Sequence, residues 1–214
     1  MRTLSAAAVA LLLSVPGCRS GEVRKEEAKV ELKARSPKPF EARKRVAVVE
    51  FEDKSGYGQG RIGRAAADVL TRFLFDSQQF RIIERQPIDK TLAEQKFQQS
   101  GAVNPQTAMQ IGKILGVEYI AYGAVTNFGI RTEGTQAVVY QQKEQVAESQ
   151  VDCRLIHVET GEVIYMGEGR GSATREIRGS FGLGGRMSYD ETLAGDSLRA
   201  AIAKLVDNLI DAAP

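Results

Sequence analysis

The sequence predicts a mixed α/β fold in which a mixed β-sheet is flanked by helices, in a single domain. The run from Val46 to Phe51 is apolar and rich in β-branched residues, as is typical of a strand buried on both faces. Apolar residues then recur at helical spacing over 60–76. Three further strand-like stretches precede a final amphipathic helix, so the predicted order is β-α-β-α-α-β-β-β-α.

The first half of the domain alternates strands and helices. We predict these elements in turn over 46–51, 60–76, 80–83, 87–97 and 105–115. Pro87 suits the first turn of a helix, which marks the start of the second helix. Asn104 and Pro105 form a cap and first-turn pair for the third helix, and Gly116 ends it.

The second half is predicted to be a strand meander closed by a helix. Strands are expected over 117–128, 150–158 and 163–169, followed by a helix over 198–209. Thr160-Gly161-Glu162 supplies the turn between the last two strands. A glycine-rich hairpin is expected around Gly179–Gly185.

The first 17 residues have the features of a lipoprotein signal peptide. Arg2 precedes an apolar stretch, Leu4–Val15, that is shorter than the roughly 20 residues needed to span a bilayer. Gly17 then precedes Cys18 in a lipobox, Val15-Pro16-Gly17-Cys18. We therefore expect cleavage before Cys18 and its acylation, which would anchor the chain in lipid.

The expected location is the outer membrane, with the domain facing the periplasm. Arg19 stands where an aspartate would favour retention in the inner membrane. Residues 18–44 are expected to form a charged, solvated linker, because 14 of the 24 residues from 22 to 45 are charged. Residues 45–214 would then be the folded domain, which is large enough to bury a core.

Composition excludes several classes of function. The formal net charge is +2, which does not indicate a nucleic-acid partner. His157 is the sole histidine, and after lipidation of Cys18 the remaining cysteine is Cys153. The chain therefore cannot build a His/Cys metal cluster or an internal disulfide, and Cys153 is expected to be a small core residue. We expect no catalytic residues, no metal and no cofactor.

Gly58, Gly60 and Gly63 form a G-x-G-x-x-G pattern before the first helix, and Glu84 ends the next strand, as in a dinucleotide-binding fingerprint. In that fingerprint the glycines follow the strand at once, so that the helix N-terminus binds pyrophosphate. Here six residues intervene after Phe51, and two helices in succession follow Glu84. We interpret the glycines as a loop at the sheet edge, with a dinucleotide enzyme as a remote alternative.

Four sets of segments, from about Arg45 to the C-terminus, have a recognisable order. They are Val46-Ala-Val-Val-Glu-Phe-Glu-Asp53, Phe80-Arg-Ile-Ile-Glu-Arg-Gln86 followed by Leu92-Ala-Glu-Gln95, Ile111-Gly-Lys-Ile-Leu-Gly116 with Tyr119-Ile-Ala-Tyr-Gly123, and Val158-Glu-Thr-Gly-Glu-Val163. Together they resemble the curli production assembly/transport lipoprotein (CsgG-like) family. The order of these segments after a lipobox is what makes the resemblance specific.

The resemblance implies an outer-membrane lipoprotein that forms a ring-shaped homo-oligomer around a channel. Amyloid subunits cross that channel unfolded, without nucleotide or catalysis, and amyloid-subunit or secretion accessory proteins are the implied partners. Glu84 and Arg85 lie within the resembling segments. We expect this charged pair to hold the strand-to-helix turn, with a subunit contact as the alternative.

Two departures from the family pattern bear on the channel. The loop Lys54–Gln59 is short, and Tyr57 is its lone aromatic residue and so the one constriction candidate. A membrane-spanning strand needs about 9–11 residues with one apolar face. Gln141–Gln145 is polar on both faces, and Arg175 with the glycines of 179–185 interrupts a second candidate, which favours a surface hairpin.

The leading hypothesis is therefore a CsgG-like outer-membrane lipoprotein, non-enzymatic and oligomeric, that acts in curli-type secretion or assembly of surface amyloid. The alternative is a monomeric periplasmic lipoprotein of the same fold that scaffolds or regulates an envelope partner.

Overall fold

The structure is a computed structural model that describes residues 30–49, 51–57, 60–84, 105–136, 141–179 and 191–213. Its elements are η1 (Phe40–Ala42), β1 (Lys44–Val48), β2 (Glu52–Asp53), α1 (Arg61–Asp76), β3 (Phe80–Ile83), α3 (Pro105–Leu115), β4 (Tyr119–Gln136), β5 (Gln141–His157), β6 (Val163–Gly179) and α4 (Glu191–Ala212). The predicted class is confirmed, and the order of elements broadly agrees. The helix expected over 87–97 lies outside the described residues, as does the glycine-rich hairpin beyond Gly179.

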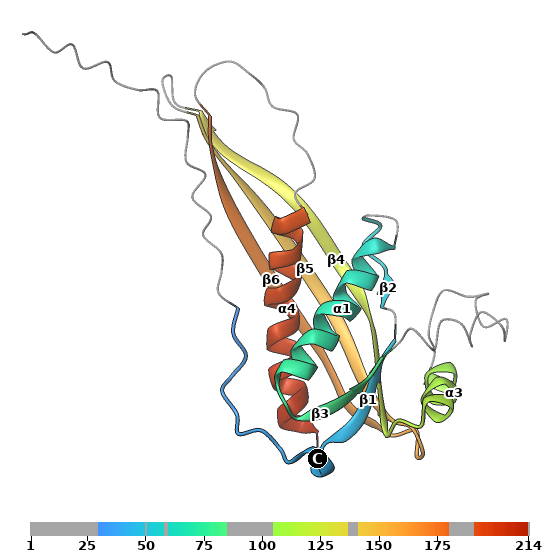
Figure 1. The fold of residues 1–214 in the computed structure, drawn as a ribbon. Helices are drawn as coiled ribbons and strands as arrows, with labels where there is room; N and C mark the ends of the chain where they lie inside the picture. The colour runs from blue at the N-terminus through green and yellow to red at the C-terminus, as the bar shows by residue number, and fades with distance from the viewer. Residues whose placement is uncertain are drawn as a thin grey trace, which may run out of the picture.

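The six described strands form one mixed sheet in the order β3-β1-β4-β5-β6. β1 lies between β3 and β4 and is parallel to both, whereas β4, β5 and β6 are antiparallel to one another. β2 continues the path of β1 and pairs with β4 further along. Figure 1 shows the three long antiparallel strands running the length of the molecule.

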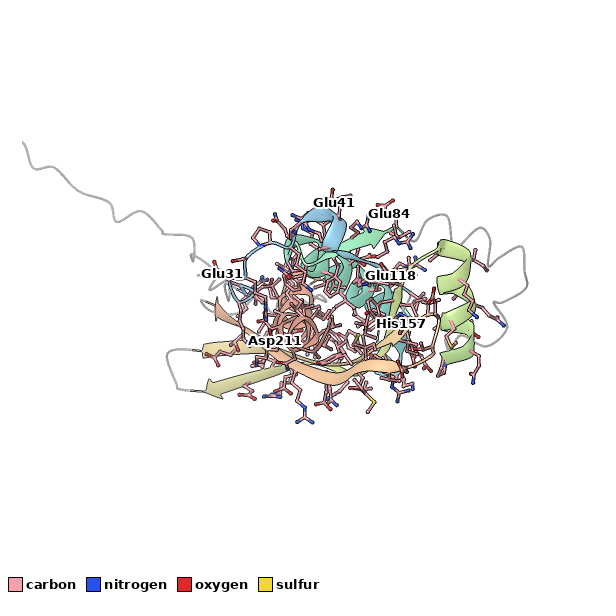
Figure 2. The ribbon with its side chains drawn as sticks, turned by 90° about the horizontal axis from the view of Figure 1, so that it is seen from below. Glu31, Glu41, Glu84, Glu118, His157 and Asp211 are labelled. Carbon is pink, nitrogen blue, oxygen red and sulfur yellow. The ribbon has the colours of Figure 1, made fainter. Side chains whose placement is uncertain are left out.

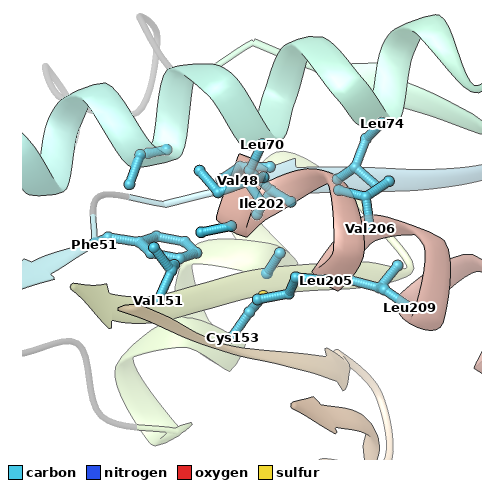
Figure 3. Packing of buried hydrophobic residues seen from close by; sticks show 14 of the residues in the cluster. Val48, Phe51, Leu70, Leu74, Val151, Cys153, Ile202, Leu205, Val206 and Leu209 are labelled. Atoms are coloured by element: carbon cyan, nitrogen blue, oxygen red, sulfur yellow. The ribbon is translucent and has the colours of Figure 1, made fainter. Parts of the chain in front are cut away.

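Helices cover both faces of the sheet around β1. Val46 and Val48 lie in a cluster with residues of α1 and α4, whereas Ala47 and Val49 lie in a second cluster with residues of α3. Figure 3 shows the first cluster, in which α1 and α4 pack together over the sheet. The predicted burial of the first strand on both faces is confirmed, because alternate side chains of an extended strand point to opposite faces.

The predicted ends of the three later strands are wrong. Instead of ending near Phe128, β4 continues to Gln136, and it is matched by β5 from Gln141 and by β6 to Gly179. Polar residues can occupy such strands because the antiparallel ladder satisfies the backbone, and the side chains of residues 131–133 are exposed.

The extra length makes an arm, which we define as residues 131–136, 141–146 and 174–179. The N-terminal end of α4 reaches only to Ala147 and Ala173, where Leu193 packs against them. A strand of 18 residues is about 60 Å long, whereas a helix of 22 residues is about 33 Å long. The arm therefore extends beyond α4 (Figure 1).

Two glycines of β6 set the distance between α4 and the sheet. A Cβ atom on Gly169 would lie 2.1 Å from the Ala201 carbonyl oxygen, and one on Gly171 would lie 2.3 Å from the Ser197 carbonyl oxygen. These gaps are too short for any side chain. The backbone of α4 therefore rests directly on the backbone of β6.

Candidate functional site

The loop between β2 and α1 is organised by Asp53. One carboxylate oxygen of Asp53 accepts hydrogen bonds from the backbone N–H and the hydroxyl of Ser55, at 3.1 and 2.6 Å. The other oxygen accepts the Gly60 backbone N–H at 3.1 Å, directly before α1. A carboxylate of the chain itself thus lies at the helix N-terminus, where a dinucleotide fold would bind pyrophosphate.

The glycines of the G-x-G-x-x-G pattern have conformational and packing roles here. Gly60 has a φ of +82°, a value that favours glycine, and it precedes the first turn of α1. A Cβ atom on Gly63 would lie 2.0 Å from the Phe51 carbonyl oxygen, so this glycine lets α1 pack onto the strand region. Gly58 lies outside the described residues. Gly60 therefore lies in the loop before α1, as interpreted, whereas Gly63 lies within α1 and not in a loop.

The structure describes two of the four sequence-predicted site residues. The Tyr57 ring packs on Phe128 of β4, with ring centroids 4.9 Å apart, at the margin of the main core cluster. Glu84 is exposed directly after β3 (Figure 2). Cys18 and Arg85 lie outside the described residues, so their roles stay predictions.

Tyr57 and Glu84 do not form one site. Glu84 follows Ile83, which pairs with Ala47 of β1, and Ala47 in turn pairs with Ile120 of β4. Tyr57 follows β2, whose Asp53 pairs with Val125, five residues further along β4. Five residues of strand correspond to roughly 17 Å. A shared contact between the two side chains is therefore excluded in this arrangement.

The N-terminal segment contains a feature that sequence reasoning missed. The expected solvated linker includes residues 30–36, here called the strap, and the strap lies against α4. Leu32 packs against the main core cluster. Arg35 Nη1 is 2.6 Å from Asp207 Oδ1, and Arg35 Nη2 is 2.7 Å from Asp211 Oδ1. Seen from below, Glu31 and Asp211 lie on the same side of the molecule (Figure 2).

These contacts form a network that we call the clasp, consisting of Lys33, Arg35, Asp207 and Asp211. Lys33 donates a hydrogen bond from its backbone N–H to Asp207 Oδ1 at 3.1 Å and another from Nζ to Asp211 Oδ2 at 3.2 Å. The Arg35 and Asp207 side chains are only 17% and 13% exposed, so water screens this pair little. Hydrogen bonds from Arg35 and Lys33 lower the pKa of Asp211 below its usual value.

The clasp has a clear electrostatic cause. The C-terminal end of a helix carries a partial negative charge, which is unfavourable for carboxylates there. α4 has Asp207 and Asp211 near this end and no basic residue in its last turn. Arg35 and Lys33 supply the missing positive charge from the other end of the chain, so the strap stabilises the end of α4.

The α3-side face of the sheet contains two buried polar atoms without hydrogen-bond partners among the described residues, Tyr122 Oη and Asp152 Oδ1. They lie diagonally across β4 and β5, because Tyr122 pairs with Arg154 and Ala124 with Asp152. Burial, and then the neighbouring Glu168, raise the pKa of Asp152 above its usual value. The folded state therefore disfavours the charged form of this carboxyl group.

Asp152→Asn is expected to raise Tm at pH 7 by a few degrees. A carboxyl group with a raised pKa in the folded state destabilises the fold while it is charged, and this cost disappears as the pH falls below its unfolded pKa of about 3.9. Thermal melts at pH 7 and pH 3 test this expectation. Asp68→Asn on the exposed face of α1 is the matched control. An equal effect of both changes at pH 7 would contradict the expectation.

The remaining singular residues are structural. Cys153 is buried in the core, as predicted. Complete burial, with Asp152 next to it, raises the pKa of its thiol to about 12, so the thiol is unreactive. His157 Nδ1 lies 3.2 Å from the Thr160 hydroxyl at the predicted turn. Within the described ranges, no group of His, Cys, Asp and Glu side chains could hold a metal ion. No described helix is both long and apolar enough to cross a membrane.

Comparison with known proteins finds three chains to which this chain is similar. A protein of Neisseria meningitidis serogroup B that is named as a lipoprotein is 27% identical over 224 residues, covering 99% of this chain and 96% of the relative. The solved lipoprotein GNA1162 of Neisseria meningitidis has a TM-score of 0.47 at 15% identity, covering 78% of this chain and 96% of its own. The C-terminal domain of LpoB from Salmonella enterica has a TM-score of 0.43 at 16% identity, and the match covers 60% of this chain and 82% of the LpoB chain.

The sequence profile of one family, described as curli production assembly/transport component CsgG, matches residues 26–213. This range extends from the strap to the end of α4 and includes all four of the resembling segments. The resemblance predicted from those segments is confirmed. The chain therefore belongs to the CsgG family.

Proposed function

We propose that this chain is an outer-membrane lipoprotein, anchored through acylated Cys18 and facing the periplasm, that acts without catalysis in curli-type secretion or assembly of surface amyloid. The family match over residues 26–213 carries this proposal. In this role the chain acts as a homo-oligomer, and the ring implied by the resemblance is the expected form. Its partners are the lipid of the membrane, amyloid subunits and secretion accessory proteins.

The polar arm supports a role in contacts with proteins in water. On its outer face Arg131 lies 2.7 Å from Glu133 and 2.6 Å from Glu148, in a ladder of charges across β4 and β5. A strand in contact with lipid needs an apolar face, which this ladder does not supply. The same polarity favours the second candidate function, a monomeric periplasmic lipoprotein that scaffolds or regulates an envelope partner.

Cys18→Ser is expected to abolish acylation and move the protein out of the membrane fraction. Intact mass measurement and cell fractionation detect both changes. Cys153→Ser is the matched control, because this buried thiol lies in the core and acylation needs a free N-terminal cysteine. A wild-type chain with an uncleaved, lipid-free leader would contradict the lipoprotein assignment.

Two further measurements separate the candidate functions. Native mass measurement of the full chain in mild detergent is expected to show a discrete oligomer, whereas one chain per particle favours the second candidate.

Deletion of the gene in its own host is expected to abolish surface amyloid, measured by dye binding. Unchanged amyloid display would contradict the proposed secretion role.

A further inference from the structure

The edge strand β6 offers a surface that the proposed function does not use. β6 is the last strand of the sheet, and nothing among the described residues pairs with its outer edge. From Met166 to Ser172 it pairs with β5 in unbroken register. Gly169 and Gly171 hold this stretch directly against α4. An open edge in unbroken register is a template for pairing with another strand.

The opposite edge of the sheet is a poorer template. β3 has only four residues. Arg81 of β3 donates a hydrogen bond from Nε to the Arg43 carbonyl oxygen at 3.0 Å, and its guanidinium lies over the Phe40 ring, 5.1 Å from the centroid. The segment around η1 therefore contacts β3, and β6 offers the longer of the two sheet edges.

The outward backbone groups of β6 belong to its even-numbered residues. The Arg170 carbonyl oxygen accepts a hydrogen bond from Lys204 Nζ of α4 at 3.3 Å, which indicates that it points away from β5. Outward and inward groups alternate along an antiparallel strand. The N–H and C=O groups of Met166, Glu168 and Ser172 therefore point outward as well.

We propose that a second copy of this chain pairs with the β6 edge in antiparallel orientation, about a two-fold axis at Gly169. In this register Glu168 lies opposite the partner's Arg170, and Arg170 lies opposite the partner's Glu168. The two side chains are 40% and 74% exposed and form an ion pair within one chain, so they are available to exchange partners. Opposite charges directly across two strands stabilise the pairing.

This register also gives hydrogen-bond partners to the outward backbone N–H and C=O groups of β6. Glu168 and Arg170 both direct their N–H and C=O groups outward, so they meet as a hydrogen-bonded pair across the axis. From Met166 to Ser172 the two edges exchange about eight backbone hydrogen bonds, with Lys204 released from the Arg170 carbonyl. The sheets of the two copies then become continuous. Such a two-fold contact is distinct from the head-to-tail contact that closes a ring.

Charge reversal tests this pairing directly. Glu168→Arg places an arginine opposite the partner's Arg170. Arg170→Glu places a glutamate opposite the partner's Glu168. Each variant alone is expected to weaken the dimer at least about tenfold. An equal mixture of the two variants restores opposite charges across the axis, so we expect it to form a heterodimer. The double variant Glu168→Arg, Arg170→Glu is expected to dimerise like the wild type.

Sedimentation of the full lipidated chain in mild detergent measures these states, with Lys113→Glu on the exposed face of α3 as the control. The proposal is supported if the wild type, the mixture and the double variant sediment at twice the mass of each single variant, whether the unit that pairs is one chain or a ring. A monomeric wild type, or an oligomer that all variants retain, would overturn it. A ring that persists in every variant would overturn the β6 contact alone and leave the proposed function intact.

Discussion

Arg35→Ala is expected to lower the free energy of unfolding by about 2–3 kcal/mol, equivalent to a fall in Tm of roughly 5–10 °C. The change removes the cation that bridges Asp207 and Asp211 and leaves the largely buried Asp207 without its main partner. It also leaves two carboxylates at the negative end of α4. Urea unfolding of the full chain at pH 7 measures the loss.

Arg72→Ala is the matched control for this variant. Arg72 and Asp76 form an ion pair within α1, but the two side chains are 71% and 41% exposed. An exposed ion pair of this kind contributes at most a few tenths of a kcal/mol. Equal losses from Arg35→Ala and Arg72→Ala would show that the clasp contributes no more than a surface ion pair.

The effect of the clasp has a defined dependence on pH. Hydrogen bonds from Arg35 and Lys33 hold the pKa of Asp211 below its ordinary value. A carboxyl group with a lowered pKa in the folded state stabilises the fold above its unfolded pKa, about 3.9, and this contribution disappears as the pH falls through the folded pKa. The difference between wild type and Arg35→Ala is therefore expected to persist from pH 7 to pH 5 and to narrow near pH 3.

Release of the strap is also expected to make the chain around Lys33 more accessible to trypsin. In the wild type, Lys33 and Arg35 are held against α4, which protects the chain next to them from trypsin. In Arg35→Ala, cleavage after Lys33 is expected to be faster, while cleavage within the sheet follows global unfolding. Mass spectrometry of early digestion products separates these two outcomes.

The central part of the fold could be predicted because its signals are local. The apolar run at 46–51 predicts a strand buried on both faces. In the structure an apolar cluster covers each face of β1. The apolar stripe over 60–76 predicts a helix that the structure has at Arg61–Asp76. In both cases the period of the apolar residues reports which faces are covered.

The arm and the strap could not be predicted in the same way. The arm residues Arg131–Gln136 carry no alternating apolar pattern, and their extended form depends on pairing with β5. The strap is highly charged, which predicts a solvated chain, but Arg35 contacts an aspartate 172 residues away. The one available signal was the pair of acidic residues near the end of α4, a position that calls for a positive charge.

Gly169→Ala is expected to lower the free energy of unfolding by about 2–3 kcal/mol, because it forces apart the two backbones that carry most of the helix-to-sheet packing. The added Cβ atom would lie 2.1 Å from the Ala201 carbonyl oxygen and 3.2 Å from the Leu205 Cβ. Backbone atoms cannot rotate away as a side chain can, so α4 has to move. This movement opens the core around Leu205, which is fully buried between α4 and the sheet.

Gly129→Ala provides the matched control, because Gly129 lies in β4, where an added Cβ atom meets nothing within 4 Å. In open space this change is expected to be neutral or stabilising by up to about 1 kcal/mol, since alanine restricts the unfolded chain more than glycine does. Each variant adds one methyl group to a glycine within a strand of the same sheet. A large gap between their urea midpoints therefore measures the close contact of α4 with β6, and equal midpoints would mean that α4 does not rest on that strand.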